Sequence, residues 1–462
     1  MKIIKGILTS KLETDNPKVL KALSDKYAFY VPGYNYTAQY KKKVWDGKKR
    51  YFKLNGLFNT GLLPKIIKDL ETIEADFTIE SSYDEDSTFY SLQPVKKFKY
   101  RDYQIDAINH CIDVKRCILE SPTSSGKTLM MAGVLASLVG PSDKAVVLIP
   151  EVGILDQTYK FFKSCGLDSL GVNFGGNFLD GNIMLTTPHS IGKIIDSHLY
   201  DAKLLMVDEA HKFCKGDTTI AAIEAFPNAE FRFAFTATPP STKAKDINAR
   251  MVLEGAFGPV YSTISVSDLI KRGQVAKPII QIINVEEEHP ELAEDMAYID
   301  IYERYITLNE KRNNLISLIA EKIKVSNPSA KILILVKDLA HLSVLSEKIP
   351  GSITIEGKDK LDDRYGSIAK FVESPTAEVI IGTNVMQTGI SIDDITHMIN
   401  ARGLNGEIPT IQGLGRGIRK GKDKSTLYFY DFMDNVKYLN THAESRIKHY
   451  KKLKFEINYA KL

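Results

Sequence analysis

The stretch Ser121–Thr128, Ser-Pro-Thr-Ser-Ser-Gly-Lys-Thr, constrains this chain more than any other. A short apolar segment at 117–120 precedes it and predicts a strand, and residues 129–138 after it predict a buried helix. A strand, a tight loop of small residues ending in Gly-Lys-Thr, and a helix together form the context of a phosphate-binding loop. Backbone N–H groups of the loop, including those of Ser124, Ser125 and Gly126, would point at the anion, as would the helix N-terminus. Lys127 would reach the outer phosphates and Thr128 would ligate Mg²⁺.

Two carboxylates, Asp208 and Glu209, follow the apolar segment 203–207 and form a second strong motif. Phosphoryl transfer to water needs a metal ion held against the phosphates and a group that activates the water. We expect Asp208 to hold Mg²⁺ and Glu209 to act on the water. The alternative, surface carboxylates in a turn, is disfavoured because the preceding strand is entirely apolar. With the phosphate loop, this pair predicts an NTPase.

Strands and helices alternate after the phosphate loop. We expect strands at 145–149, 181–188, 203–207 and 230–235. Near-continuous apolar strands joined by helices predict a parallel sheet covered on both faces, with ligands at the carboxyl ends of the strands. The polar motifs fall at those ends. There, Thr236 and Thr238 could relay the state of the acidic pair or could cap the following turn.

A second α/β domain is predicted by further strands at 279–285, 331–336, 352–355, 378–382, 397–400 and 425–430. It contains a Gly-rich stretch, 412–420, with Arg416 and Arg419 three residues apart, a spacing that places both on one face of a helical turn. A γ-phosphate held by the first domain still needs cations, and an arginine finger is worth about 10³–10⁵ in rate. A basic surface turn is the alternative interpretation.

The bulk properties set outer limits. A chain of 462 residues exceeds one ordinary core, so two to four domains are expected. No apolar run reaches the roughly 18–20 residues of a membrane span. The four cysteines form no C-x-x-C pair, which favours buried thiols in a reducing cytosol over zinc or disulfides. A net charge of +4 permits nucleic-acid binding without arguing for it.

The N-terminal segment has its own composition. Residues 30–52 interleave tyrosines and the sole tryptophan, Trp45, with lysines that include Lys41, Lys42 and Lys43. Trp45-Asp-Gly47 is typical of a hairpin turn. A basic aromatic hairpin can bind phosphates and stack on bases, at roughly 1–3 kcal/mol per stacked base. A solvated hairpin whose aromatics pack a small core is the alternative.

We therefore expect an N-terminal α+β domain at 1–95 that binds DNA, parallel-sheet domains at 96–265 and 266–445, and a basic tail at 446–462. Gln104 precedes the phosphate loop, and its amide could bond the two-faced edge of adenine. Taken alone, a glutamine on a helix is usually a surface residue.

In their order along the chain, these blocks resemble the motifs of superfamily 2 helicases of the DEAH type. The matching blocks are Ser121–Thr128, Asp208–His211, Thr236–Pro239, Gly382–Ser391 and Gln412–Arg419. The Tyr-Val-Pro-Gly-Tyr and Trp-Asp-Gly stretches of the N-terminal segment are similar to those of UvsW-type phage recombination helicases. The second half is similar to the XPB and RecG-like branch.

The resemblance implies two RecA-like domains with ATP between them and nucleic acid across their tops. It implies Gln104 for adenine, Lys127, Thr128, Asp208 and Glu209 for phosphates, Mg²⁺ and catalysis, and His211, Thr236 and Thr238 for coupling. It further implies Gly389 and Asp393 at the ATP cleft, Gln412 with the fingers Arg416 and Arg419, and Pro150, Thr187 and Thr383 near the nucleic-acid backbone.

UvsW-like helicases act on branched DNA, which implies branch migration, fork regression or D-loop unwinding with 3′→5′ polarity. The implied partner is branched or forked DNA with single-stranded regions. The implied protein is a monomer in the cytoplasm, that of the host if the chain comes from a phage. Alternatives left open are an RNA helicase, a duplex-DNA translocase of a restriction system, and a binding module with a degenerate motor.

The phosphate loop departs from the family pattern, which has Gly or Ala at the position of Ser121 and often Gly at that of Ser124. Serine fits both positions provided that φ is negative there. The departure bears on the rate of ATP hydrolysis.

Overall fold

The structure is a computed structural model that describes residues 1–192, 201–287, 289–356, 359, 361–383, 394–405, 417–418 and 424–460. The chain divides into two compact units: Met1–Pro122 and Gly126–Ile264 form the first, and Ser265–Leu462 together with Thr123–Ser125 form the second. Gly389, Asp393, Gln412, Arg416 and Arg419 lie outside the described residues.

The N-terminal part of the first unit is a small α+β domain. Its four-stranded sheet has the order β5-β2-β1-β6, in which β6 runs parallel to β1 and the other pairs are antiparallel. The strands are β1 (Lys2–Lys5), β2 (Thr9–Glu13), β5 (Leu57–Asn59) and β6 (Thr78–Ser81), and the helices are α1 (Pro17–Lys26) and α3 (Leu63–Thr72). Ile3, Leu12, Phe52, Phe58 and Ile66 form its buried core. The N-terminal residues form two antiparallel strands, β1 and β2, joined by a turn.

A second, two-stranded ribbon pairs β3 (Ala28–Tyr30) with β4 (Lys48–Arg50). The prediction of a tight hairpin turn at Trp45-Asp-Gly47 is wrong. The connection between β3 and β4 is residues 31–47, which contain the 3₁₀ turn η1 (Tyr34–Tyr36) and the helix α2 (Ala38–Lys41). Thr37 caps α2 by accepting from the backbone N–H of Tyr40, and the Val31 N–H donates to Gly47 O at the base. We call residues 31–47 the lysine loop.

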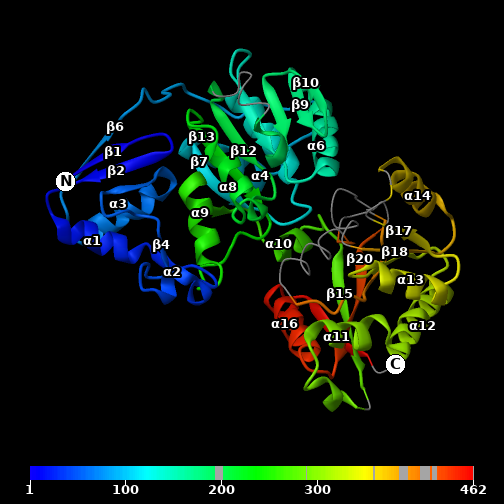
Figure 1. The fold of residues 1–462 in the computed structure, drawn as a ribbon. Helices are drawn as coiled ribbons and strands as arrows, with labels where there is room; N and C mark the ends of the chain where they lie inside the picture. The colour runs from blue at the N-terminus through cyan, green and yellow to red at the C-terminus, as the bar shows by residue number, and fades with distance from the viewer. Residues whose placement is uncertain are drawn as a thin grey trace. The chain divides into compact units, whose positions relative to one another are not determined.

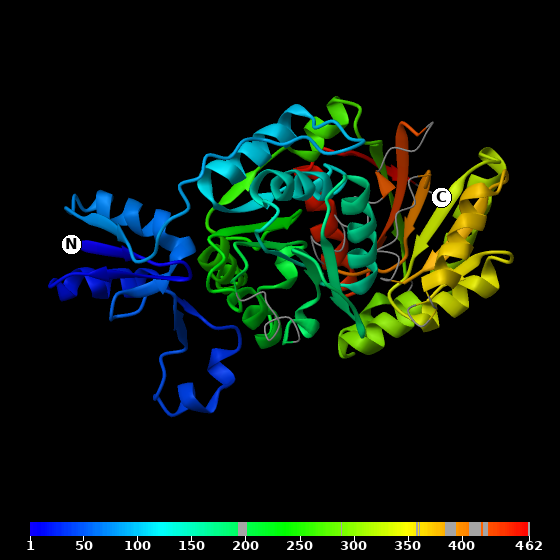
Figure 2. The same ribbon diagram turned by 90° about the horizontal axis from the view of Figure 1, so that it is seen from above.

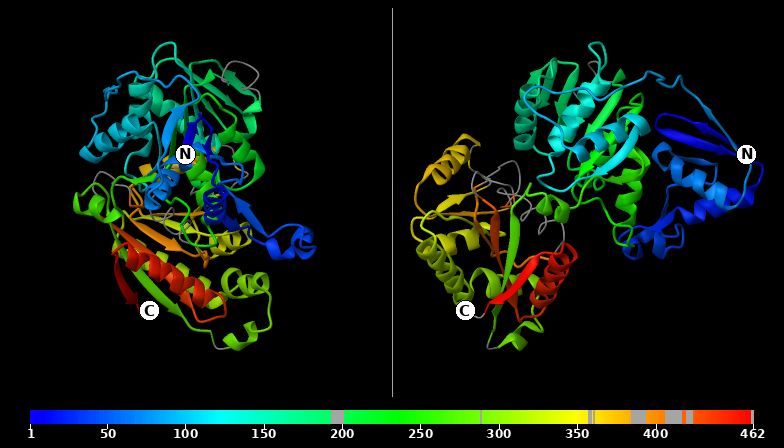
Figure 3. Two further views of the ribbon diagram at one scale, coloured as in Figure 1. Left: turned by 90° about the vertical axis from the view of Figure 1, so that its left-hand side faces the viewer. Right: turned by 180° about the vertical axis from the view of Figure 1, so that it is seen from behind.

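This N-terminal domain is docked on helix α9 (Ile247–Phe257), as Figures 1 and 3 show. The Tyr51 hydroxyl donates to Asn248 O at 3.0 Å, and the Asn248 amide donates to Tyr30 O at 2.7 Å. The Lys65 ammonium lies 2.5 Å from the buried carboxylate of Glu254. A Cβ on Gly61 would lie 2.0 Å from Glu254 O, so the backbones meet closely here. The base of the lysine loop is therefore fixed to α9.

The second part of the first unit is an eight-stranded sheet with the order β10-β9-β11-β8-β12-β13-β7-β14. Every neighbouring pair is parallel except β9 with β10. Its strands are β7 (Arg116–Glu120), β8 (Ala145–Leu148), β9 (Leu170–Phe174), β10 (Asn177–Leu179), β11 (Ile183–Thr186), β12 (Leu204–Val207), β13 (Phe231–Thr236) and β14 (Val260–Ser262).

Helices cover both faces of this sheet (Figure 2). They are α4 (Asp102–Val114), α5 (Lys127–Leu138) and α6 (Val152–Ser164) on one face, and α8 (Asp217–Glu224) and α9 on the other. Successive residues of a strand point to opposite faces, so Leu119 packs in the α4–α6 core while Ile118 packs in the α8–α9 core. Strands buried on both faces explain the continuous apolar runs of the sequence.

The second unit contains a seven-stranded, wholly parallel sheet with the order β17-β18-β16-β19-β20-β15-β21. Its strands are β15 (Lys277–Val285), β16 (Lys331–Leu335), β17 (Ile353–Ile355), β18 (Glu378–Gly382), β19 (His397–Asn400), β20 (Thr426–Asp434) and β21 (Glu456–Ala460). Its helices are α10 (Val266–Lys271), α11 (Tyr298–Tyr302), the π-helical turn η7 (Glu303–Thr307), α12 (Glu310–Ser326), α13 (Leu339–Lys348), α14 (Leu361–Glu373) and α16 (Leu439–Lys452). α12 and α13 pack on one face, whereas α16 contacts β20 through the other.

The predicted fold class is confirmed: two parallel-sheet α/β domains follow one another, preceded by an α+β domain. The segment expected as a basic tail holds the end of α16 and the strand β21, which pairs with β15. Among the described residues, no helix is long and apolar enough to cross a membrane. All four cysteines are buried.

Candidate active site

The strand order of the first sheet brings three of the predicted motifs together. β13 lies between β7 and β12, so the phosphate loop, Thr236 and Asp208 leave three neighbouring strands at one edge. Thr236 is in register with Glu120, and the Ser121 N–H donates to Thr236 O at 2.9 Å. The sequence motifs therefore meet at the carboxyl edge where parallel sheets bind ligands.

The phosphate loop connects β7 to α5 in the predicted order of strand, loop and helix. Gly126 caps α5 with φ +82°, and a Cβ there would lie 2.4 Å from Gln104 Nε2, so the position favours glycine. Lys127 and Thr128 begin the helix, and the Lys127 ammonium donates to Ser121 O at 3.3 Å. Such a loop and helix N-terminus can bind an anion.

The two loop serines differ in backbone conformation. Ser121 has a negative φ, as its fit requires, but Ser124 has φ +70° in the left-handed region. The requirement stated for both serines, a negative φ, is therefore not met at Ser124. A non-glycine residue held there costs about 1–3 kcal/mol. Ser121 is buried, and its Oγ accepts from the Thr263 hydroxyl at 2.9 Å.

Glycine at these two positions is expected to have opposite effects on stability. Ser124→Gly relieves the left-handed strain, so the free energy of unfolding should be unchanged or rise by up to ~1 kcal/mol. Ser121→Gly removes the hydrogen bond from the Thr263 hydroxyl and raises the entropy of the unfolded chain. Both effects should lower the free energy of unfolding, by about 1–2 kcal/mol in total. Urea denaturation of both variants gives the measurement. Equal destabilisation by the two would contradict the assigned backbone strain.

The acidic pair follows β12. Asp208 is buried, and its Oδ1 accepts from the Glu209 N–H at 2.9 Å. Burial, and next the neighbouring Glu209 carboxylate, raise the pKa of Asp208, while the Lys127 ammonium acts in the opposite direction. Glu209 has φ 49°, and this left-handed turn directs the chain into η5 (Ala210–Lys212). A buried carboxylate with a raised pKa is what a bound cation would stabilise in its charged form.

His211 joins the acidic pair to Thr236. Its Nδ1 lies 2.9 Å from Thr236 Oγ1 and 3.5 Å from Glu209 Oε2. Thr236 Oγ1 also accepts from the Thr238 N–H at 3.2 Å. Burial lowers the pKa of His211, so the ring is neutral near pH 7. This chain of contacts fits a relay, and the Thr238 bond shows that Thr236 also caps the following turn.

The chemistry of the donor set is compatible with Mg²⁺ and ATP. Within the described ranges, Glu209 Oε2 and Thr238 Oγ1 are buried with no hydrogen-bond partner. Buried polar atoms normally have a hydrogen-bond partner, so these two oxygens are acceptors that a further polar group could satisfy. Asp208 and Thr128 could hold the metal ion, and the loop with Lys127 could hold the phosphates.

Gln104 lies in the first turn of α4, against the phosphate loop. Its Oε1 accepts from the Arg101 N–H at 2.9 Å, and its amide nitrogen is the group nearest a Cβ on Gly126. The side chain is buried rather than on the surface. Its position beside the loop is compatible with adenine recognition.

The strand-end residues fall where they were expected within each sheet. Pro150 follows β8, Thr187 follows β11 with its hydroxyl donating to Ser190 Oγ at 3.1 Å, and Thr383 follows β18 in the second unit. No pattern in the sequence points to Thr263, whose hydroxyl bonds Ser121. β14, which precedes Thr263, has three residues, too few to show a period.

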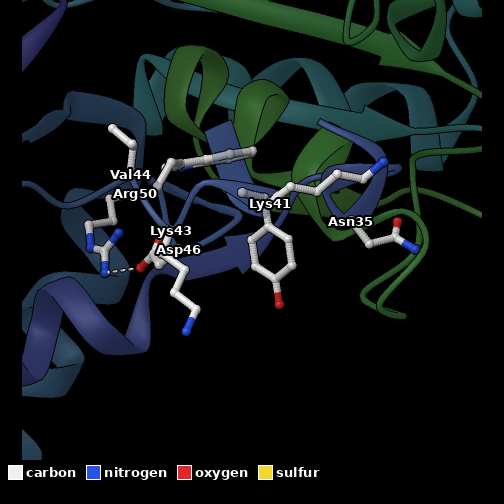
Figure 4. A pocket seen from close by; sticks show the side chains of 8 residues that line it. Asn35, Lys41, Lys43, Val44, Asp46 and Arg50 are labelled. Carbon is white, nitrogen blue, oxygen red and sulfur yellow. Dashed lines mark hydrogen bonds and ion pairs between the residues drawn. The ribbon is translucent and has the colours of Figure 1, made fainter. Parts of the chain in front are cut away.

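The lysine loop surrounds a hollow of about 780 Å³ (Figure 4). Its lining residues are Asn35, Tyr40, Lys41, Lys43, Val44, Trp45, Asp46 and Arg50. Asp46 and Arg50 pair at 2.6 Å, whereas Lys41, Lys42 and Lys43 are exposed. The hollow therefore carries a net positive charge from its lysines.

The loop's aromatic residues have mixed environments. Tyr30 stacks on Tyr34 with centroids 4.5 Å apart, and Tyr34 meets Tyr40 edge-on at 4.8 Å. The Trp45 indole N–H donates to Lys48 O at 2.9 Å. The tyrosine contacts support the structural role that the sequence left open. Tyr36 and Val44, by contrast, are 78% and 79% exposed.

Comparisons with known proteins identify related helicase sequences. The family profile "Type III restriction enzyme, res subunit" matches residues 97–241, and "Helicase conserved C-terminal domain" matches 310–421. The ATP-dependent DNA helicase UvsW of Enterobacteria phage T4 is 24% identical over 94% of this chain and 93% of its own length. The DNA 3′-5′ translocase XPB2 of Sulfurisphaera tokodaii is 22% identical over 72% of this chain and 81% of its own.

Among solved structures, S. cerevisiae Dbp5 bound to RNA and ADP BeF3 matches with a TM-score of 0.56 and 15% identity. The match covers 79% of this chain and 90% of that one, and it supports the tandem fold alone. Fold, ordered motifs and family profiles together define an ATP-dependent helicase of superfamily 2. Within that superfamily, the chain resembles the UvsW-type phage helicases.

Proposed function

We propose that this helicase acts on DNA and remodels branched structures by branch migration, fork regression or D-loop unwinding, with 3′→5′ polarity. One observation carries the proposal: the similarity to T4 UvsW covers 94% of the chain, beyond the stretches matched by the two helicase profiles. That relative is named a DNA helicase. XPB2, named a DNA 3′-5′ translocase, supports the polarity.

ATP hydrolysis would use the edge of the first sheet. The phosphate loop with Lys127 and Thr128 binds the phosphates, Gln104 contacts the adenine, and Glu209 orients and deprotonates the attacking water. Mg²⁺, held by Asp208 and Thr128, would neutralise charge on the phosphates. His211, Thr236 and Thr238 would transmit the state of the nucleotide through their contacts.

The second unit would complete the ATP site. In this proposal Gly389 and Asp393 line the nucleotide, and Gln412, Arg416 and Arg419 act on the γ-phosphate. Arginines supplied by another domain make hydrolysis depend on domain closure, which is how hydrolysis drives movement along a strand. Pro150, Thr187 and Thr383 would contact the nucleic-acid backbone. The protein would act as a monomer in the cytoplasm, that of the host if it comes from a phage.

The lysine loop would bind DNA phosphates beside the motor. Its support is the exposed run Lys41–Lys43 on a loop whose base is hydrogen-bonded to α9. Because α9 packs on the same sheet that carries the phosphate-loop helix, the lysine loop belongs to the same compact unit as the first motor domain. Trp45 and the hollow would receive an unstacked base.

Replacing Lys41, Lys42 and Lys43 by alanine should weaken binding of forked DNA and make the slope of log affinity against log salt shallower by up to about 2–3. Fluorescence anisotropy across a salt series gives both quantities. A control variant of equal charge removes the exposed lysines Lys18, Lys21 and Lys68 of α1 and α3. Unchanged affinity of the first variant, or equal losses in both, would assign the lysine loop a structural role.

The proposed substrate is tested by unwinding of a Holliday junction, a fork and a simple tailed duplex under one set of conditions. Branched substrates should be processed faster than the tailed duplex, and forked DNA should stimulate ATP hydrolysis more than RNA does. Stronger stimulation by RNA would favour the RNA helicase. Equal movement on unbranched duplex, without unwinding, would favour the restriction-type translocase.

A further inference from the structure

The lysine loop leaves two apolar side chains in solvent. Val44 is 79% exposed and Tyr36 is 78% exposed. Tyr36 precedes the helix α2 and Val44 follows it, and the exposed lysines Lys41, Lys42 and Lys43 lie between them in sequence. A single exposed apolar side chain is ordinary on a protein surface. Apolar side chains flanked by cations, however, are the composition with which proteins enter a DNA duplex.

Other aromatic side chains of the same segment are packed. The Tyr34 ring lies between those of Tyr30 and Tyr40, with centroids 4.5 and 4.8 Å away. Gly47 has φ +80°, and a Cβ there would lie 2.5 Å from Tyr34 Cδ2, so the backbone passes directly against this ring. The two exposed side chains are therefore carried by a packed frame and are left out of it.

The base of the loop lies toward the carboxyl edge of the first sheet. β13 ends at this edge with Thr236, and α9 follows it and leads back to β14, which runs parallel to β7. The N-terminal end of α9 is therefore near the carboxyl edge. Asn248, in the first turn of α9, donates to Tyr30 O at 2.7 Å, directly before the lysine loop. Pro150 and Thr187, the proposed contacts of the nucleic-acid backbone, follow strands at the same edge.

We propose that Tyr36 and Val44 form a wedge that enters between the bases at a branch point of DNA and separates the first base pair of a duplex arm. The lysines of the loop would hold the phosphates on either side. Val44 lines the same hollow as Trp45 (Figure 4), so a base freed at the wedge has an aromatic face beside it. This inference rests on the proposed action on branched DNA and names the residues that open the duplex.

The test replaces both wedge residues in the full chain, as Tyr36→Ser with Val44→Ser. The matched control is Leu54→Ser with Ile73→Ser, two side chains of the same domain that are 62% and 57% exposed and lie outside the lysine loop. The wedge variant should unwind a fork about three- to fortyfold more slowly, the cost of unstacking one base-pair step without help. ATP hydrolysis stimulated by single-stranded DNA should be unchanged, because no base pair has to open. The control should match the natural chain in both measurements.

A second readout needs no ATP. Permanganate oxidises thymines that have left the duplex stack, so forks with a thymine on one strand or the other at the branch point report an opened base pair. Saturating amounts of the natural chain should raise the reactivity of at least one of these thymines, and the wedge variant should lose this rise.

Four results would overturn the wedge: equal permanganate reactivity with the natural chain and the variant, undiminished unwinding by the variant, an equal loss in the control, or a parallel loss of unwinding and of hydrolysis on single strands. If the natural chain opens no branched substrate at all, the proposed function fails, and the wedge with it.

Discussion

Lys127→Ala is expected to lower ATP turnover by at least about 10²–10³-fold, the effect of removing one preorganised donor from a site where charge develops. Lys127 is the first residue of α5, directly after Gly126, and its ammonium bonds Ser121 O across the loop. That position lets it meet the outer phosphates of a nucleotide seated on the helix N-terminus. Steady-state phosphate release with saturating forked DNA gives the measurement.

The substitution should leave the fold intact, because the lysine's hydrogen bond to Ser121 O is long, at 3.3 Å, and the side chain is half-buried. The melting temperature should stay within the range of an ordinary surface change. Lys163→Ala, an exposed lysine in the last turn of α6, is the matched control. Normal turnover by Lys127→Ala would contradict a motor built on this loop.

The architecture could be predicted because a strand buried on both faces is a continuous run of apolar residues in the sequence. β12 and β13 are apolar over most of their length, and polar residues stand at the edge where ligands bind. That pattern needs no knowledge of distant contacts. Strands that have only three residues or bury few side chains show a weak hydrophobic pattern. The sequence therefore does not predict β10, β14 or β21.

The lysine loop was misjudged for a different reason. Alternating residues around Trp45-Asp-Gly47 resemble a hairpin, and the strands β3 and β4 do pair. The helical turns between them depend on Gly33 with φ +76° and on the Thr37 cap, which compete locally with extended backbone. Tyr34 and Tyr40 then pack on each other, a contact that spacing along the chain does not reveal.

Within the candidate site, residue types were predictable and backbone conformations were not. The acidic pair, Lys127 and Thr236 were identified from their places after strands. The left-handed φ of Ser124 and the bond from Thr263 to Ser121 depend on how neighbouring strands set the loop. Contacts in the second unit are equally hidden, because the Tyr302 hydroxyl donates to Arg402 O across 100 residues of sequence.

Glu209→Gln is expected to bind ATP yet to hydrolyse it about 10²–10⁴-fold more slowly, the range for loss of general-base catalysis. Glutamine has the same shape, but its amide cannot take a proton from water. The carboxylate Oε2 is buried without a hydrogen-bond partner among the described residues and lies 3.5 Å from His211 Nδ1. A carboxylate oxygen whose lone pairs accept no hydrogen bond is chemically suited to orient and deprotonate a water molecule.

Nucleotide binding should survive, and the charges of the pair explain why. Burial, and next repulsion from the Glu209 carboxylate, raise the pKa of Asp208, so removing the Glu209 charge favours the ionised Asp208 that a metal ion needs. ATP affinity should therefore be equal to that of the natural chain or tighter, measured with a fluorescent ATP analogue in the presence of Mg²⁺. Glu224→Gln, at the exposed end of α8, is the control. Loss of both binding and hydrolysis would show that Glu209 holds the nucleotide rather than activating water. Undiminished hydrolysis would show that another residue at this edge of the sheet is the general base.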